Sequence, residues 1–318
     1  MSRWTTLLMD EAELSRLPDL PVGDVLRHAD LVTRERPGPI DLYRRWERQQ
    51  WSAEDLALER DAAMMADPRV PEPMRALLRE TVATFIIGEY TGLDMLGPIM
   101  VGSPDEEYSL FLGTQVADEA RHTRAVFRMG EEVLGLDPEP RRMLAQAWQM
   151  STPAHTELAL LEGEVMRGVT RTPDDHETWL QAVALFHLVT EGVLALVGQR
   201  VLVHALREVR LFDGIKTAFT AMCRDESRHV GFGLHALRRG LLDGHADAVH
   251  DVLERAVPIA LRLDEEFDGI ATDFRPMSID ILRRHLAVIG ADPVFVSHLL
   301  DQHDPRLPQH ASLRRTAP

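Results

Sequence analysis

The sequence predicts an all-α protein with a four-helix core, and three observations support this class. Long segments carry apolar residues at the helical period, whereas no segment of useful length shows the alternation of a β-strand. Prolines, glycines and helix-capping residues separate these segments. The five-residue pattern DExRH occurs twice inside them, at residues 118–122 and 225–229. With 318 residues, 45% of them hydrophobic, the chain can bury a large core.

The expected elements follow in chain order. Residues 1–40 form a proline-punctuated lead-in, residues 41–300 a single helical domain, and residues 301–318 a polar tail of disordered composition. The core helices are expected at residues 74–98, 108–134, 176–209 and 215–242. Further helical patterns cover residues 42–65, 140–169 with an interruption at Thr152 and Pro153, 245–267, 278–288 and 293–299.

Composition limits the classes of partner. A net charge of -16 argues against nucleic acid or an anionic membrane surface, because binding phosphates requires a basic surface. A single cysteine, Cys223, excludes an internal disulfide and suits the cytoplasm, and the first residues show no export signal. Residues 180–206 are apolar enough to suggest a membrane span, but His187, Glu191 and Arg200 within them favour a buried bundle helix. We therefore expect a cytoplasmic protein without a membrane span.

The repeated pattern has the spacing of metal ligands. Residues three apart share one face of a helix, so Glu119 with His122, and Glu226 with His229, each direct a carboxylate and an imidazole the same way. One Glu-x-x-His pair is weak evidence, since chance alone produces it. Two copies of DExRH inside apolar helices are stronger evidence. The alternative is that these are solvent-facing residues of amphipathic helices.

Two further glutamates complete a known arrangement. Glu89 lies in FIIGEYTG and Glu191 in LVTEGVLALVG, where apolar neighbours predict burial. One glutamate from each of two helices and a Glu-x-x-His pair from each of two others form the dimetal-carboxylate site of ferritin-like bundles. Such ligands suit two iron ions or a manganese/iron pair, and suit zinc poorly. The fold expected is thus a ferritin-like bundle with additional flanking helices.

Three polar residues are expected to support the ligands. Metal-bound histidines usually donate their other ring N–H to a carboxylate, so Asp225 is expected to orient His122, and Asp118 to orient His229. Ordinary surface acids are the alternative. His187 precedes Glu191 by one turn and is expected beside it as a further ligand or a donor, or else as an ordinary core histidine.

The motifs also resemble a family. RDESRHVGFGLHAL and LYRRWERQQWSAEDLALERD resemble the small subunit of class I ribonucleotide reductase, and HLVTEGVLALVG and ADEARHTRAVFRMG are still more similar to the ligand-binding oxidases that share its fold. The resemblance covers about residues 40–265. It implies one metal on Glu89, Glu119 and His122, the other on Glu191, Glu226 and His229, bridging by Glu119 and Glu226, and an electron relay at Trp51, with Trp46 as the rival.

Departures from both relatives narrow the function. The radical tyrosine of the reductase subunit would fall at Val126. The oxidases link a tyrosine to a valine through an ether bond, and the resemblance places these residues at Phe186 and Gly92, so the link cannot form here. The oxidising power is then expected to act on a bound substrate or on another group.

We therefore expect an oxygen-activating dimetal oxidase or oxygenase that acts on a small organic substrate and receives electrons from an external donor. The resemblance implies a homodimer. Phe85, Phe186 and Leu194 either line a substrate pocket or simply pack in the core. The alternatives are a ribonucleotide reductase small subunit without a tyrosyl radical, a ferritin-like iron-binding protein and, more remotely, a dinuclear hydrolase.

Overall fold

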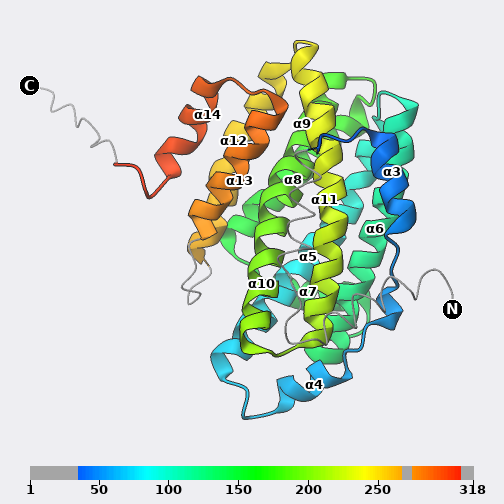
Figure 1. The fold of residues 1–318 in the computed structure, drawn as a ribbon, viewed down its shortest axis with the longest axis vertical. Helices are drawn as coiled ribbons and strands as arrows, with labels where there is room; N and C mark the ends of the chain where they lie inside the picture. The colour runs from blue at the N-terminus through cyan, green and yellow to red at the C-terminus, as the bar shows by residue number, and fades with distance from the viewer. Residues whose placement is uncertain (1–34, 267–273, 309–318) are drawn as a thin grey trace, which may run out of the picture.

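The computed structural model describes residues 35–266 and 274–308. Within these residues every regular element is a helix, which confirms the all-α class (Figure 1). The core helices are α5 (Glu72–Val101), α6 (Glu106–Arg128), the continuous run of α9 (His176–Val183), η3 (Ala184–Ala195) and α10 (Leu196–Val209), and α11 (Asp213–Leu242). The other elements are α3 (Pro39–Arg48), η1 (Ala53–Asp55), α4 (Glu59–Ala66), η2 (Met129–Val133), α7 (Pro140–Trp148), α8 (Pro153–Arg171), α12 (Ala246–Glu266), α13 (Phe274–Ile289), α14 (Pro293–Leu300) and η4 (Asp301–His303).

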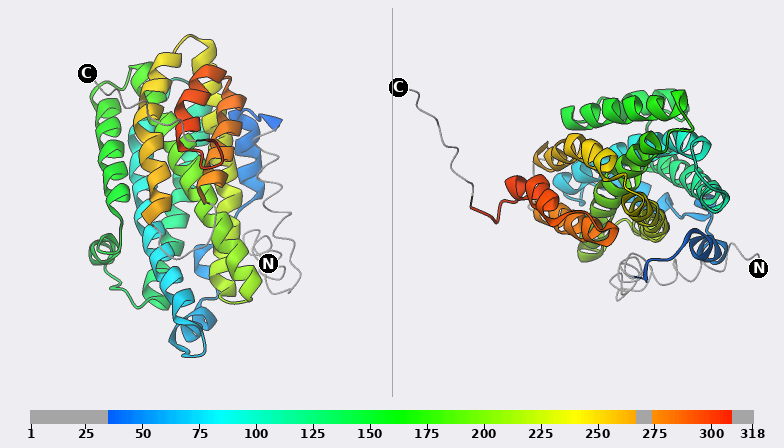
Figure 2. Two further views of the ribbon diagram at one scale, coloured as in Figure 1. Left: turned by 90° about the vertical axis from the view of Figure 1, so that its left-hand side faces the viewer. Right: turned by 90° about the horizontal axis from the view of Figure 1, so that it is seen from above.

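The flanking helices cover the core from several sides. The ribbon places α3 beside α6 and α11, on the side away from α12, α13 and α14 (Figure 1). Seen from above, α8 and α3 lie on opposite sides of the core (Figure 2). These outer helices bury the core helices on most sides, so polar side chains at the centre are removed from water.

Local sequence explains most helix starts. Asp105 accepts a hydrogen bond from the Tyr108 backbone N–H at 2.8 Å and so caps α6, and Thr152 caps α8 through the His155 N–H at 3.2 Å. The interruption expected at Thr152 and Pro153 is therefore present, and it separates two helices, α7 and α8.

The helical pattern over residues 42–65 is not one helix. It divides into α3, η1 and α4, and the connecting residues carry Trp51, which is only 2% exposed. The sequence predicted a continuous helix because Trp51 fits the spacing of the apolar residues in this pattern. In the structure its indole instead leaves the helical path to reach a buried aspartate of α11.

The third core helix also differs from the expected regular α-helix. Residues 184–195 form a π-helix, η3, and at its end the Leu196 backbone N–H donates to the carbonyl of Glu191, five residues earlier. Eight of these twelve residues are apolar, and their spacing in the sequence does not distinguish a π-helix from an α-helix. The run 176–209 is long and apolar enough to cross a membrane, yet 78% of its most apolar window is buried inside the fold, as in a core helix.

The start of α11 is held by a distant aspartate. Asp61 of α4 is fully buried and accepts hydrogen bonds from the backbone N–H groups of Ile215 at 2.7 Å and Gly214 at 3.4 Å. A Cβ on Gly214 would lie 2.3 Å from the Ala57 carbonyl oxygen, so only glycine permits this approach. Asp61 thus fixes the helix that carries the second DExRH pattern.

Replacing Asp61 with alanine should therefore destabilise the protein by about 1–3 kcal/mol, because two buried N–H groups lose their acceptor. Chemical denaturation measures the change, and Asp41→Ala, at an exposed position of α3, is the control. Asp61→Asn keeps an acceptor and should cost less. Equal stability of the alanine variant and the wild type would show that Asp61 does not hold α11.

Candidate metal centre

The six residues predicted as ligands meet in the middle of the core. Each is at most 5% exposed. They come from four core helices: Glu89 from α5, Glu119 and His122 from α6, Glu191 from η3, and Glu226 and His229 from α11. Segments separated by up to 140 positions in the chain thus contribute to one buried cluster.

The ligand atoms form two overlapping groups. One contains Glu89, Glu119, His122 and Glu226, the other contains Glu119, Glu191, Glu226 and His229, and within each group the atoms lie within 4.8 Å of one another. Glu119 and Glu226 belong to both groups, as carboxylates that bridge two ions must. The centroids of the two imidazole rings are 5.9 Å apart. The cluster can hold two metal ions.

The charges in the cluster also fit two metal ions. The four glutamates form ion pairs with the two histidines, such as His122 Nδ1 with Glu89 Oε2 at 3.3 Å and His229 Nδ1 with Glu191 Oε1 at 3.3 Å. Among the described residues, Glu119 Oε1, His122 Nδ1 and Glu191 Oε2 are buried and, beyond such ion-pair contacts, make no hydrogen bond. Two divalent cations would balance four carboxylates and take up these atoms.

The pKa values of the glutamates differ: contacts with His122 and His229 lower the pKa of Glu226 to about 2 against the effect of burial. Burial raises the pKa of Glu191 to about 7 and raises the pKa of Glu119 well above its ordinary value. A bound cation favours the charged form of a carboxyl group and so reverses this effect.

The aspartate of each DExRH pattern contacts the histidine of the other. Asp225 Oδ2 lies 3.2 Å from His122 Nε2, and Asp118 Oδ2 lies 3.2 Å from His229 Nε2. Nε2–H of each ring can donate to the aspartate, which leaves Nδ1 directed at the cluster as an electron-pair donor. The two copies thus have the same arrangement: each places a Glu-x-x-His pair in the cluster and an aspartate on the histidine of the other copy.

An arginine neutralises the two aspartates. Arg228, 1% exposed, donates from Nη2 to Asp118 Oδ2 at 2.8 Å and to Asp225 Oδ1 at 2.7 Å. Burial opposes the charged form, yet the Arg228 guanidinium holds the pKa of Asp225 well below its ordinary value. Arg121, the arginine of the other copy, also donates to Asp118. Both aspartates are thus kept ionised as acceptors.

Two tryptophans extend the Asp–His pairs outward. Trp51 Nε1 donates to Asp225 Oδ2 at 2.6 Å, and Trp46 Nε1 donates to Asp118 Oδ1 at 3.0 Å. Trp51 is fully buried and stacks on His122, with ring centroids 6.1 Å apart, whereas Trp46 is half-buried. The two indoles therefore occupy corresponding positions on the two aspartates.

His187 reaches the cluster through a glutamine. Its Nε2 lies 3.0 Å from Gln115 Oε1, and the Gln115 amide donates to Glu191 Oε1 at 2.9 Å. Burial lowers the pKa of His187 to about 3, so the ring is neutral. His187 belongs to neither ligand group, and its place is that of a residue that orients Gln115.

Four polar residues near the cluster were not predicted from the sequence: Arg228, Arg121, Gln115 and Gln199. The Gln199 amide donates to Glu226 Oε1 at 3.3 Å. The role of the two arginines could have been inferred from the sequence, since both copies of DExRH contain an arginine at the same position. The role of Gln115 could also have been inferred, because it precedes Glu119 by four residues and so shares its helix face. No pattern in the sequence pointed to Gln199 beyond its place in an apolar segment.

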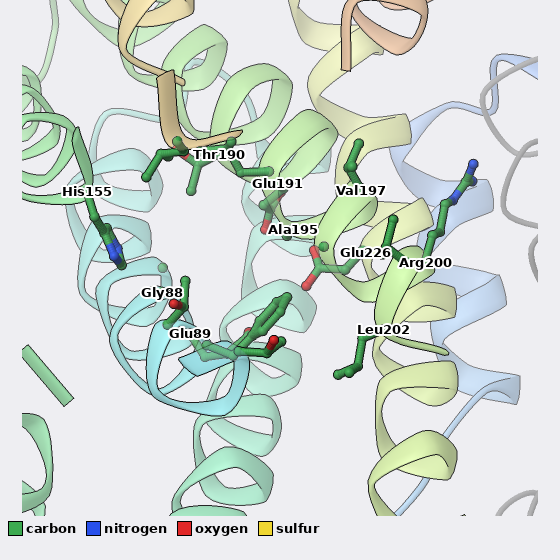
Figure 3. A pocket seen from close by; sticks show the side chains of 18 of the residues that line it. Gly88, Glu89, His155, Thr190, Glu191, Ala195, Val197, Arg200, Leu202 and Glu226 are labelled. Carbon is green, nitrogen blue, oxygen red and sulfur yellow. The ribbon is translucent and has the colours of Figure 1, made fainter. Parts of the chain in front are cut away.

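A cavity of about 550 Å³ opens onto one side of the cluster (Figure 3). Glu89, Glu119, Glu191 and Glu226 form part of its wall, and the rest is mainly apolar. Phe85, Phe186 and Leu194 are all in that wall. The volume lies within the range of small-molecule sites, about 300–1,000 Å³.

Gly92 and Phe186 face each other at this wall. A Cβ on Gly92 would lie 3.4 Å from Phe186 Cε2 and 3.2 Å from Glu119 Oε2. A larger side chain at position 92 would therefore press on a glutamate of the cluster. The glycine leaves that carboxylate open to the cavity.

With the fold and cluster described, the chain can be placed in a family: it belongs to the ribonucleotide reductase small chain family, whose model matches residues 30–267. This agrees with the expected ferritin-like dimetal-carboxylate class. A search of curated protein sequences found no match.

Several solved structures of R2-like ligand-binding oxidases are similar to the chain. A valine-to-leucine variant with an anaerobically reconstituted Mn/Fe cofactor has 19% identity and a TM-score of 0.67, over 79% of this chain and 92% of that one. A tyrosine-to-phenylalanine variant with an aerobically reconstituted Mn/Fe cofactor has 17% identity and a TM-score of 0.62, over 85% and 93%. A glycine-to-leucine variant with a non-activated Mn/Mn cofactor has 18% identity and a TM-score of 0.67, over 79% and 91%. This likeness establishes a shared fold.

Arg228→Met should weaken metal binding about 10–100-fold, because the two aspartates that orient the histidines lose their shared cation. Metal content after dialysis against graded chelator concentrations measures the affinity. Arg124→Met is the control. Arg124 lies on α6, as Arg121 does, but it is exposed and pairs with Glu54 of η1, so this variant should bind metal with wild-type affinity. If Arg228→Met is folded by circular dichroism and retains wild-type affinity, the arginine has no part in the centre.

Proposed function

We propose that the protein is a dimetal oxidase that uses dioxygen to oxidise a small organic molecule bound beside two iron ions or a manganese/iron pair. The observation that carries this proposal is the apolar cavity whose wall includes four buried glutamates of the cluster. A molecule in that cavity has no polypeptide between itself and the metal ligands. Sites for small organic molecules are typically preformed apolar pockets with few polar groups, and the cavity has this character.

In this proposal Glu89, Glu119 and His122 hold one metal and Glu191, Glu226 and His229 hold the other, with Glu119 and Glu226 shared. The bound metals supply the electron transfer to dioxygen that protein side chains alone cannot. Asp225 and Asp118 hold the two imidazoles in the tautomer that binds metal through Nδ1.

The protein directs the oxidising power to the substrate. Phe186 has no hydroxyl group, and Gly92 has no side chain, so neither residue offers a group for an internal crosslink. The wall beside the cluster is mainly apolar, so it offers few other groups for oxidation. The molecule in the cavity is then the group available for oxidation.

Electrons are proposed to enter from an external donor through Trp51. Its indole is bonded to Asp225, which contacts His122, so a continuous path of three side chains leads to the first metal position. The proposal also places the protein in the cytoplasm as a homodimer, in keeping with its single buried cysteine and its resemblance to the oxidases.

One observation favours the oxidase over a reductase small subunit. Val126 is fully buried near the cluster, one turn beyond His122, where the reductase resemblance requires a radical tyrosine. A storage role for iron gives no purpose to an apolar cavity of this size beside the ligands.

Wild-type protein reconstituted anaerobically with Fe(II) should bind two metal ions per chain and consume dioxygen when air is admitted. Glu191→Ala and His229→Ala should each lose at least one metal, because a ligand is removed from the second group. Elemental analysis and an oxygen electrode measure both properties. His235→Ala, on the same helix as His229 but against Tyr108, is the control. Full metal content in both ligand variants would refute the assignment.

Trp51→Phe should slow the reduction of the oxidised metal centre by a chemical donor about tenfold, because the indole N–H contact with Asp225 is lost. Stopped-flow spectroscopy measures the rate. Trp46→Phe is the matched variant, since Trp46 makes the equivalent bond to Asp118, and it should stay close to the wild-type rate. If Trp46→Phe slows the reduction and Trp51→Phe does not, Trp46 is the residue that relays electrons.

A further inference from the structure

The cavity contains a polar position separate from the metal ligands. His155 and Glu162 of α8 and Thr190 of η3 line it together. His155, Leu158 and Glu162 all face the cavity, as the spacing of three and four residues along a helix requires. Figure 3 shows His155 and Thr190 on one side of the cavity, with Arg200 and Leu202 on the other.

Glu162 is a buried carboxyl group with little compensation. It is 4% exposed and accepts one hydrogen bond, from Thr190 Oγ1 at 2.8 Å, and the described residues give it no ion pair. Burial raises the pKa of Glu162 to about 7, although the Thr190 hydroxyl opposes that shift. A carboxylate removed from water without a cation is costly, and this one is part of the cavity wall.

The position of Glu162 suits contact with a substrate. Its partner Thr190 directly precedes Glu191 in η3, and Glu162, Thr190 and Glu191 all line the same cavity. One molecule in the cavity can therefore touch Glu162 at one end and lie against the metal-ligand wall with another part. Phe85, Phe186 and Leu194 provide apolar surface for the remainder.

We propose that the cavity binds an apolar amine, with its ammonium group paired to the Glu162 carboxylate and its hydrocarbon part against the aromatic wall. This inference rests on the proposed function, because it names the substrate class of the same cavity. An ammonium supplies the cation and the hydrogen-bond donors that Glu162 lacks. An ionised Glu162 would repel a substrate carboxylate, and a neutral alcohol would supply no cation to it.

Binding of three probes of matched shape tests the proposal: 4-phenylbutylamine, 4-phenylbutanol and 4-phenylbutyrate. Calorimetry uses the full chain loaded with Mn(II) without oxygen, so no turnover occurs. The amine should bind at least about tenfold more tightly than the alcohol, and Glu162→Gln should remove that advantage while leaving the alcohol unchanged. Glu162→Asp, which keeps the charge, should restore part of it.

Glu164→Gln is the matched control. Glu164 lies two residues further along α8, is exposed, and pairs with Arg255 at 2.8 Å, so its loss should not alter amine binding. Thermal unfolding and metal content establish that each variant is folded. Equal affinity for amine and alcohol, tighter binding of the butyrate, or an undiminished amine affinity in folded Glu162→Gln would overturn the inference.

The two proposals fail separately. Calorimetry of the metal-free chain repeats the comparison without any metal chemistry. Glu162-dependent amine binding by a protein that consumes no oxygen supports the amine site and counts against the oxidase. Oxygen consumption by a protein that binds the amine no better than the alcohol supports the oxidase and rejects the amine site.

Discussion

Burial of four glutamates at the centre of a helical bundle is the constraint to which the rest of the structure responds. They form ion pairs with His122 and His229, and two imidazoles cannot balance four charges. Two metal ions can, so the cluster ties the stability of the core to metal binding. The surrounding helices then have to keep water out and hold each ligand in place, which explains why α3, α8 and α12 cover a core already complete in four helices.

The two DExRH copies hold the buried glutamates and histidines in an approximately symmetric arrangement. Each copy gives a ligand pair to its own side and an aspartate to the histidine opposite, and Arg228 joins the two aspartates. The symmetry extends to Trp51 and Trp46, but it is broken by burial, since the first is enclosed and the second is half-buried. Two nearly equal halves of the cluster therefore have unequal surroundings, with an enclosed indole on one side and a half-buried indole on the other.

Much of the centre could be predicted from the sequence because its information is local. Helical spacing fixes Glu119 relative to His122, and apolar neighbours predict burial of Glu191. The contacts of Asp225 with His122 and of Asp118 with His229 join different helices, and they were predicted because metal-bound histidines usually need a carboxylate partner. No such rule points to the pairing of Gln115 with Glu191 or to the place of Glu162 in the cavity, so these could not be predicted. The π-helix of residues 184–195 could not be predicted either, because the spacing of its apolar residues does not reveal a change of helix type.

The cavity, rather than the ligand cluster, is where this chain can differ from its family. Ligands are restricted by the chemistry of two metal ions, whereas wall residues are restricted only by packing. Gly92 leaves the space beside Glu119 open, and Glu162 places a carboxyl group where apolar packing alone would have favoured a hydrocarbon side chain. A charge that lowers the stability of an empty cavity is explained if a bound molecule supplies the opposite charge. In that case the unfavourable free energy of burying the Glu162 carboxylate is offset when an ammonium group binds, and this favours amines over other molecules.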